Sequence, residues 1–278
     1  MRSHDAELLE AIKDIAREAG DLAFAWFRAG KETKARIDWK HGGSPVSEAD
    51  FEVDVFLRAR LGALVPDAGW LSEETADGPE RLGKRRVFIV DPIDGTRAFI
   101  RGDWRWAVSI ALVEDGEPRL GVLRLPARDL MFEASIGGGA FLNGAALKAS
   151  ERPDLAGATI AGPANILDAL ARSGLEITRE PRVPSLAYRL ARVATGEVDA
   201  AIASTDAWDW DIAAADLIVR ESGGVLSGLD GRAPTYNRQQ PRHGVLGAAP
   251  AHLHGALVSR LRKASDPSQE ANDKKPLT

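Results

Sequence analysis

Residues 87–100 read VFIVDPIDGTRAFI and place two acids at the end of an apolar run. Val87–Val90 fits a buried strand, and Asp91-Pro92 ends its ladder because proline has no N–H to donate. Asp94-Gly95-Thr96 predicts a turn whose glycine lets the backbone approach a ligand closely. Two carboxylates at the mouth of an apolar strand are costly to desolvate unless a cation binds them. Because such oxygen ligands suit Mg²⁺ together with substrate phosphate, the stretch predicts a metal–phosphate site.

The composition excludes several classes of protein. The 278 residues include no cysteine, 44% are hydrophobic, and the net charge is −5. The lack of cysteine excludes disulfides and fits a cytoplasmic protein. The negative charge argues against a nucleic-acid polymer as partner. No apolar run is long enough for a membrane helix, and the N-terminus lacks a signal-peptide core. We therefore expect a cytoplasmic protein with a small-molecule ligand.

Hydrophobic periodicity predicts the elements of the first 150 residues. Helices are expected over 5–28 and from Ser47, a possible N-cap with Asp50 as its capping-box partner, to near Gly62. Short strands are expected over 33–39 and 69–75. Apolar runs at 106–113, 120–125 and 130–134 predict an antiparallel meander, followed by a hairpin turn at Gly137–Gly139. This half reads as α+β and contains the metal site.

A change of composition near residues 150–160 places a boundary there. Residues 151–262 read as α/β, with strands over 158–161, 198–203 and near Leu246. Helices are expected over 166–173, 185–195, 212–221 and up to about residue 261. The polar segment from Lys263 to Thr278 predicts a disordered tail. The two halves, 1–150 and 151–262, are expected to form one structural unit.

Four segments, in order along the chain, resemble motifs of the inositol monophosphatase superfamily. They are SPVSEAD at 44–50, SEET at 72–75, DPIDGT at 91–96 and WDIAA at 210–214. Ser72 stands where this family usually has glycine, and Ala215 where glycine often follows. The resemblance implies a layered αβαβα sandwich of the inositol monophosphatase and fructose-1,6-bisphosphatase type. It also implies a Mg²⁺-dependent, lithium-sensitive phosphomonoesterase that acts on a small phosphorylated metabolite and forms a homodimer.

The resemblance also implies roles for individual residues. Two or three Mg²⁺ ions would be bound by Glu73, Asp91, the carbonyl of Ile93, Asp94 and Asp211. Glu73 and Thr96 would orient the attacking water, with Asp50 organising the catalytic threonine. Gly95, Thr96, Arg189 and Asp211 would contact the substrate. From the residues alone, helix capping by Asp50 and Asp211 and a solvated Glu73-Glu74 pair stay open as alternatives.

Three features favour a 3′(2′),5′-bisphosphate nucleotidase, which converts adenosine 3′,5′-bisphosphate to AMP and phosphate. They are the SPVSEAD segment, the acid Asp209 before Trp210, and Arg189, where that branch has a lysine. Arginine binds a second phosphate bidentately. Ser204 stands where inositol phosphatases carry a glutamate that contacts inositol. An inositol-1-monophosphatase, a histidinol-phosphatase and a non-catalytic protein that binds a phosphate ligand stay open as alternatives.

Other notable residues receive structural interpretations. Trp104, Trp106 and Trp208 could stack on an adenine, but packing in the core or at the rim is the simpler interpretation. The basic run Arg81–Arg86 is typical of a solvated loop. The five histidines, including His41 and His243, lack metal-ligand spacing and are expected to be structural or exposed.

Overall fold

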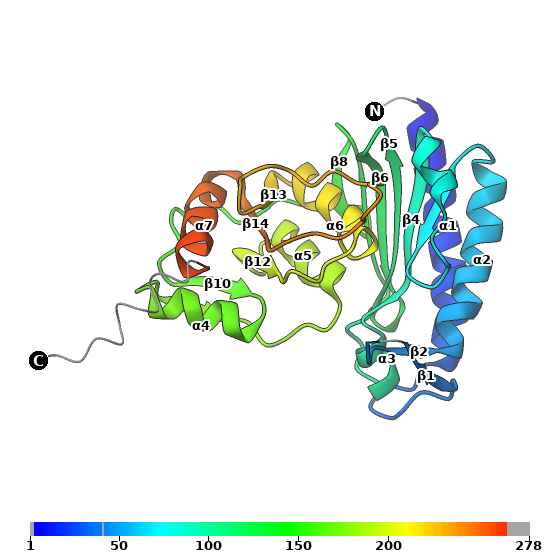
Figure 1. Ribbon diagram of the computed structural model, residues 1–278, viewed down its shortest axis with the longest axis horizontal. Coiled ribbons are helices and arrows are strands. Elements are labelled where there is room, and N and C mark those ends of the chain that lie inside the picture. Colours follow the sequence, from blue (N-terminus) through cyan, green and yellow to red (C-terminus); the bar gives the residue numbers. More distant parts are fainter. Residues whose placement is uncertain (1–2, 41, 266–278) are drawn as a thin grey trace, which may run out of the picture.

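The computed structural model describes residues 3–40 and 42–265 (Figure 1). Within them the α-helices are α1 Ser3–Trp26, α2 Glu48–Leu64, α3 Thr96–Arg101, α4 Ala164–Arg172, α5 Leu186–Ala194, α6 Asp209–Glu221 and α7 Ala251–Ala264. Short 3-10 turns are η1 Pro79–Gly83 and η2 Pro126–Arg128. The strands are β1 Ile37–Trp39, β2 Pro45–Ser47, β3 Gly69–Ser72, β4 Arg86–Asp94, β5 Ala107–Glu114, β6 Glu117–Leu125, β7 Leu130–Ser135, β8 Gly139–Leu142, β9 Ala145–Ala146, β10 Ala158–Ala161, β11 Ile177–Arg179, β12 Ala200–Ala203, β13 Gly224–Gly228 and β14 Leu246–Pro250.

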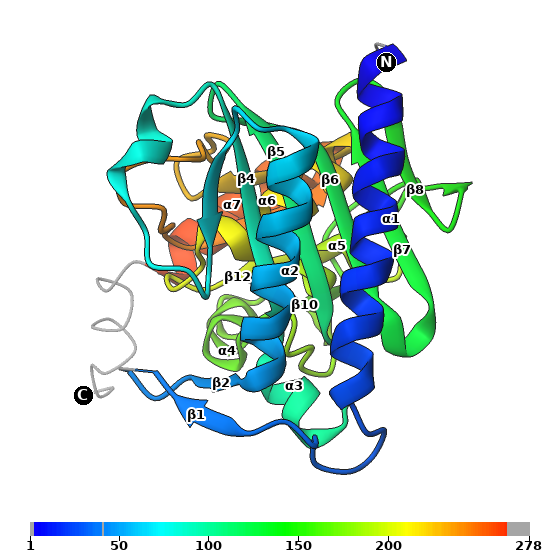
Figure 2. The ribbon, with the colours of Figure 1, turned by 90° about the vertical axis from the view of Figure 1, so that its right-hand side faces the viewer.

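Helices and sheets alternate in layers across the molecule. Helices α1 and α2 cover one face of a seven-stranded sheet, where they cross its strands in Figure 2, and α6 covers the other face. Helices α5 and α6 in turn contact the five-stranded sheet, whose far side is covered by α4 and α7 (Figure 1). This is the αβαβα sandwich expected from the sequence.

The two main sheets differ in topology. The larger has the order β3-β4-β5-β6-β7-β8-β9 and is antiparallel apart from the parallel pair β3–β4. The smaller has the order β11-β10-β12-β14-β13, with β10 parallel to both of its neighbours. Strands β1 and β2 form a separate antiparallel ribbon. The parallel β3–β4 pair brings the ends of two motif-bearing strands to the same edge, which positions the site described below.

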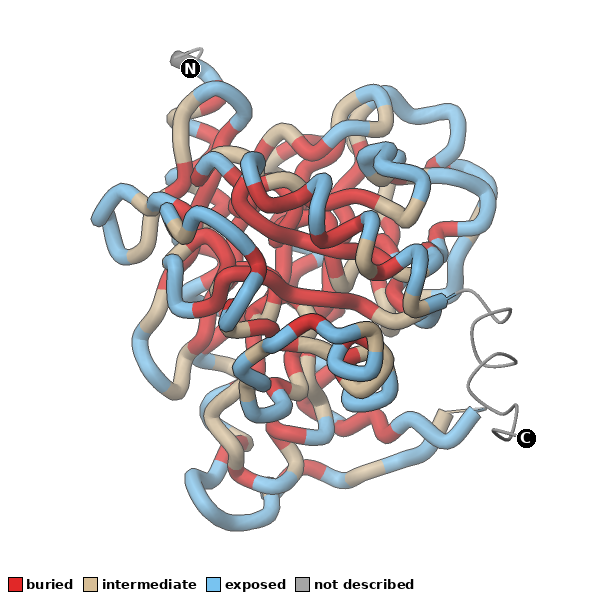
Figure 3. The backbone as a smooth tube through the Cα atoms, turned by 90° about the vertical axis from the view of Figure 1, so that its left-hand side faces the viewer, coloured by how far each residue is buried: buried red, intermediate tan, exposed pale blue. Residues whose placement is uncertain are grey.

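The largest apolar core lies between the two sheets, around α5 and α6. In Figure 3 the buried segments, drawn in red, run through the middle of the molecule. Three successive alanines, Ala213–Ala215, let α6 lie close to strand β6. At Gly121 of β6 an added Cβ would come within 2.9 Å of the Ala214 carbonyl oxygen. Small residues on both elements therefore set the depth at which α6 sits.

Most of the predicted elements are present, including the meander as β5–β7 and the hairpin turn that leads to β8. The sequence analysis missed strands β2, β9, β11 and β13. Helix α7 continues through Lys263 to Ala264, two residues into the predicted tail, and the remainder of that tail, from residue 266, lies outside the described residues. None of the helices in the described part of the chain is long and apolar enough to cross a membrane. The boundary near residue 150 stays a proposal.

The close approach of α6 to β6 yields a stability prediction. Gly121→Ala places a methyl group against backbone that cannot move freely, so we expect a loss of about 1–3 kcal/mol of unfolding free energy. Gly62→Ala in α2 is the matched control, because its Cβ would meet nothing within 4 Å and helix propensity should raise stability by about 0.5–1 kcal/mol. Denaturant unfolding measures both. Equal stability of the two variants would contradict the close-packing explanation.

Candidate active site

Strand β4 ends with the DPID part of the motif, which places Asp91 and Asp94 at the floor of a cavity. Its pairing with β5 is regular up to Asp91, and the register shifts between Asp91 and Asp94. The backbone N–H of Ile93 donates to Asp91 Oδ1 at 3.0 Å, which fixes the first carboxylate. Gly95 follows with φ 94°, and a Cβ there would lie 3.1 Å from the backbone nitrogen of Ser185. Only glycine fits this turn without displacing the chain before α5.

Three predicted ligands meet on this floor. Asp91, Asp94 and Asp211 each place a carboxylate oxygen within 4.8 Å of those of the other two. Asp211 comes from the first turn of α6, where it accepts a hydrogen bond from the Trp208 N–H at 2.7 Å. The cavity above them has a volume of about 680 Å³ and is also lined by Glu73 and Thr96. Residues 120 positions apart in sequence thus share one site.

Burial and mutual repulsion make these carboxylates costly to ionise without a cation. Burial, and then the charges of Glu73 and Asp94, raise the pKa of Asp91 well above its usual range. Burial, and then Asp94 and Glu73, raise the pKa of Asp211 in the same way. An all-oxygen donor set with unfavourable negative charge suits a hard divalent cation such as Mg²⁺. The residues present therefore fit the metal that the sequence predicts.

Asp94 also caps a helix from the other half of the chain. Its carboxylate accepts hydrogen bonds from Ser185 Oγ, from Leu186 N at 3.0 Å and from Ala187 N at 2.7 Å. These bonds oppose the effect of burial, which raises the pKa of Asp94 to about 6. Because α5 has N–H groups without intrahelical partners at this end, the carboxylate satisfies the helix and keeps lone pairs for a metal.

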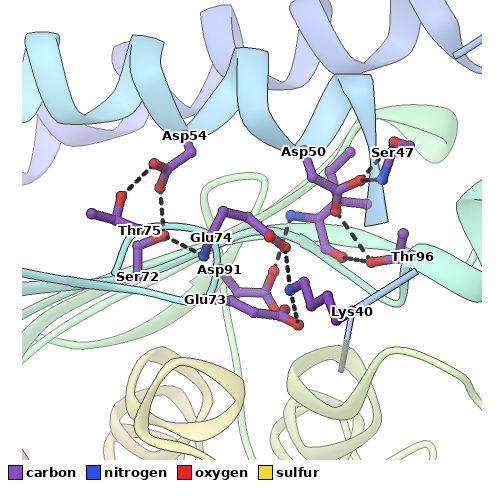
Figure 4. A network of polar contacts seen from close by, with 11 residues as sticks. Lys40, Ser47, Asp50, Asp54, Ser72, Glu73, Glu74, Thr75, Asp91 and Thr96 are labelled. Atoms are coloured by element: carbon purple, nitrogen blue, oxygen red, sulfur yellow. Dashed lines mark hydrogen bonds and ion pairs between the residues drawn. The ribbon is translucent and has the colours of Figure 1, made fainter. Parts of the chain in front are cut away.

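Asp50 and Thr96 form a hydrogen-bonded pair beside the acidic cluster (Figure 4). Thr96 Oγ1 lies 3.2 Å from Asp50 Oδ1 and 3.1 Å from the carbonyl oxygen of Ile93. Ser47 donates to Asp50 Oδ2 from both its N–H and its hydroxyl, at 2.8 and 2.6 Å. Burial, opposed by these Ser47 bonds, raises the pKa of Asp50 to about 6. Asp50 therefore both caps α2 and contacts Thr96, so the two sequence interpretations are compatible.

Lys40 is a residue of the site that the sequence analysis missed. Its ammonium lies 2.9 Å from Glu73 Oε1 and 2.8 Å from Glu74 Oε1 (Figure 4). Burial lowers the Lys40 pKa, but the two glutamates more than offset this and raise it. Burial, followed by the Glu73 charge, raises the pKa of Glu74 to about 7. The glutamate pair is therefore ion-paired with Lys40 and not simply solvated. Lys40 lies 33 positions before Glu73 in the sequence, so no local pattern indicates this contact.

The loop that carries Glu73 is tied to α2 through Asp54. The carboxylate of Asp54 accepts hydrogen bonds from Ser72 Oγ and, at 2.6 Å, from Thr75 Oγ1 (Figure 4). Asp54 is only 6% exposed. Ser72, the departure from the family's glycine, thus supplies one of the two hydroxyls that anchor this loop. The sequence analysis assigned Asp54 no role.

A buried network supports the start of α6. Asp209 is fully buried and accepts a hydrogen bond from the Asn237 N–H at 2.8 Å, while His243 Nε2 lies 2.7 Å from its other oxygen. Arg81 donates to Asn237 Oδ1 at 2.7 Å and to Asp77. Arg81 is 3% exposed, so the prediction of a solvated basic run is wrong at this position. His243 is structural, as expected, and His41 lies outside the described residues.

The remaining predicted contacts lie near the cavity without lining it. Arg189 is half-buried, and its buried Nε atom has no hydrogen-bond partner. Burial lowers the pKa of its guanidinium, and the charges of Asp94 and Asp211 oppose this shift. Trp106 is fully buried, Trp104 packs edge-on against Tyr188, and Trp208 stacks on Trp210. None of these tryptophans is among the cavity-lining residues. The packing interpretation of the tryptophans therefore agrees with the structure.

Comparisons with known proteins agree with this geometry. The model of the inositol monophosphatase family matches residues 4–266. The chain belongs to this family. It is 37% identical over 93% of its length to the histidinol-phosphatase of Mycobacterium tuberculosis, covering 98% of that protein. It is 30% identical over 84% of its length to the 3′(2′),5′-bisphosphate nucleotidase CysQ of Aggregatibacter actinomycetemcomitans, covering 88% of it.

Solved structures of family members have the same fold. The extragenic suppressor protein suhB of Bartonella henselae superposes with a TM-score of 0.81 at 29% identity, over 92% of this chain and 99% of that one. Family members are Mg²⁺-dependent phosphatases, and this chain is a phosphatase of the family. Relatives of different substrate specificity match it at similar identity, so the substrate must be inferred from the site itself.

The raised pKa values predict that metal-free protein loses stability as the pH rises from about 4 to about 7. The folded-state pKa of Asp94 is about 6 and that of Glu74 about 7, both above the unfolded values, so the folded state releases its protons at higher pH. Asp91→Asn keeps the acceptor for Ile93 N and removes one charge. We expect this variant to be more stable than wild type in EDTA at pH 7.

Urea unfolding in EDTA across this pH range measures the difference between the two proteins, and the exposed Asp21→Asn serves as the control. The gap between wild type and Asp91→Asn should shrink toward pH 4. Saturating Mg²⁺ should stabilise wild type by about 2.7 kcal/mol at one hundred times its Kd and the variant by less. A wild type that is more stable than Asp91→Asn in EDTA at pH 7 would contradict this explanation.

The Asp54 anchor predicts a link between loop order and activity. Asp54→Ala leaves two hydroxyls without their acceptor, so we expect about 1–3 kcal/mol less stability and roughly tenfold lower kcat/KM through displacement of Glu73. Ser72→Gly is the matched variant, because it keeps the Thr75–Asp54 bond and should lose less of both. Thermal unfolding and steady-state kinetics measure the two effects. Unchanged kcat/KM in Asp54→Ala would limit Asp54 to a purely structural role.

Proposed function

We propose that Glu73, Asp91, the carbonyl of Ile93, Asp94 and Asp211 bind two or three Mg²⁺ ions and that the site hydrolyses phosphomonoesters. The observation that carries this proposal is the meeting of three carboxylates within 4.8 Å at the base of an open cavity. Bound Mg²⁺ supplies a water of lowered pKa and offsets the charge on the phosphoryl oxygens. The protein supplies the orientation of water and phosphate.

Glu73 and Thr96 are the groups that we assign to the water. Thr96 donates its hydroxyl proton to Asp50 Oδ1 or to the Ile93 carbonyl, which leaves its oxygen lone pairs to accept a hydrogen bond from the water. The Glu73 carboxylate accepts the other proton as the water oxygen attacks phosphorus. The phosphorus–oxygen ester bond breaks, and solvent protonates the departing alkoxide. No covalent intermediate with the protein is required.

We propose a bisphosphate such as adenosine 3′,5′-bisphosphate as the substrate. Arg189 supports this assignment by its charge and not by lining the cavity: its guanidinium interacts electrostatically with Asp94 and Asp211, and its buried Nε atom has no hydrogen-bond partner. Similarity to a relative named 3′(2′),5′-bisphosphate nucleotidase is consistent with it. Asp209 no longer supports it, because its carboxylate bonds His243 and Asn237 instead of facing the cavity.

Histidinol phosphate is the second candidate, favoured by the 37% identity to a histidinol-phosphatase. Its ammonium group would enter a cavity lined by four arginines. Apart from the proposed metal ligands, the only acid that the described residues contribute to this lining is Asp103. Because like charges repel, the arginines favour the bisphosphate over histidinol phosphate. Inositol 1-phosphate as substrate, lithium sensitivity and a homodimer stay predictions from the family resemblance, and a cytoplasmic location stays a prediction from the composition.

Steady-state kinetics with Mg²⁺ on adenosine 3′,5′-bisphosphate, inositol 1-phosphate and histidinol phosphate test the substrate. We expect the bisphosphate to be preferred at least tenfold in kcat/KM, about 1.4 kcal/mol of transition-state stabilisation. Arg189→Ala should reduce that preference. A preference for either monophosphate, unaffected in Arg189→Ala, would leave the phosphatase chemistry standing and overturn the nucleotidase assignment. Binding of ligand without phosphate release from any of the three would favour a non-catalytic protein.

A further inference from the structure

The buried part of the cavity lining, its floor, includes Asp91 and Asp94, whereas Arg97, Arg101 and Arg182 are exposed and mark its mouth. The lining also contains the acids Glu73 and Asp211 and a fourth arginine, Arg105. Asp103 is the further acid of the lining, and Arg105 contacts both of its carboxylate oxygens. A metal at the floor needs the acids, but it gives no reason for arginines at the mouth.

Of these four arginines only Arg105 has an anionic partner among the described residues, and the side chains of Arg101 and Arg182 have no hydrogen-bond partner there either. Arg97 donates to the Gly43 carbonyl oxygen at 2.9 Å, and Arg105 bonds Asp103. Among the described residues, neither Arg101 nor Arg182 has an acid within ion-pair distance. Arg182 also faces a like charge, because its guanidinium is one of the causes that lower the pKa of buried Arg189. Unpaired cations gathered on a concave wall are stabilised by an anion placed between them.

The backbone of both residues is held firmly, which favours a prepared site. Arg101 ends α3, and the Gly102 carbonyl oxygen accepts the Gly30 N–H at 2.9 Å. The Arg182 carbonyl oxygen accepts a hydrogen bond from Arg105 Nη1 at 3.0 Å. Arg101 belongs to the first half of the chain and Arg182 to the segment before α5. The two side chains are therefore presented to the same cavity from fixed positions on different segments.

We propose that Arg101 and Arg182 form a subsite for a second anionic group of the substrate, a phosphate or a carboxylate that is not hydrolysed. Guanidinium groups bind such groups bidentately. The inference rests on the proposed phosphatase function and deepens it, because it assigns selectivity to the mouth of the cavity as well as to Arg189. The substrate class is a small phosphomonoester with a second negative group.

The test compares substrates that differ only in the second anion. One pair is adenosine 3′,5′-bisphosphate and adenosine 3′-monophosphate, and the other is 2-phosphoglycerate and glycerol 2-phosphate. The first pair tests a second phosphate, and the second tests a carboxylate. Mg²⁺-dependent kcat/KM is measured for wild type, for the double variant Arg101→Gln and Arg182→Gln, and for the control Arg172→Gln on the exposed end of α4.

In wild type we expect, in at least one pair, the ester with the second anionic group to have a kcat/KM about tenfold or more above that of the ester without it. This is the size expected for a charge-assisted hydrogen bond. The double variant should reduce that ratio about tenfold, and Arg172→Gln should leave it unchanged. Equal kcat/KM ratios in wild type and the double variant, or no preference in wild type, would overturn the proposed subsite. Phosphate release in the same assays would still support the phosphatase activity. No Mg²⁺-dependent phosphate release from any of the four esters would overturn the proposed function itself.

Discussion

The carboxylate of Asp94 is the contact on which the rest of the site depends. It belongs to β4, yet it satisfies the backbone N–H groups of Leu186 and Ala187 at the start of α5. The same side chain lies in the cluster with Asp91 and Asp211. One acid therefore fixes how the helix layer meets the seven-stranded sheet. It also fixes the wall that carries Arg182, because that residue lies only a few positions before α5.

The candidate site contains buried carboxylates whose charges repel one another. Several acids line its floor, and the pKa values of Asp91 and Asp211 rise because burial, and then the charges of the neighbouring acids, oppose ionisation. Such strain persists only where the surrounding structure overrides it. Here the opposing support is specific: Lys40 beside Glu73 and Glu74, and backbone N–H groups around Asp94 and Asp211. The net charge of −5 hides this local separation of acids from arginines.

The resemblance of four local motifs to the family predicted the layered fold, and three of the acids that it singled out, Asp91, Asp94 and Asp211, lie together in the structure. It could not predict contacts between distant segments. Arg81 in a basic run looked solvated, but its partner Asn237 lies 156 residues away. In the sequence Asp209 is a feature of the nucleotidase branch, but its carboxylate contacts His243, which lies 34 positions away. Strands β11 and β13 were missed because short strands of mixed composition depend on their neighbours for pairing.

The order of the ligands along the chain has a consequence for biosynthesis. Strands β4–β8 leave the ribosome before α6, which covers one face of their sheet and carries Asp211. At roughly 5–20 residues per second, that apolar face waits several seconds for its cover. During this interval the nascent chain exposes an apolar sheet face that favours association, and it contains only two of the three clustered acids, Asp91 and Asp94. Completion of α6 therefore covers that face of the sheet and brings the last of the three clustered acids to the site in the same step.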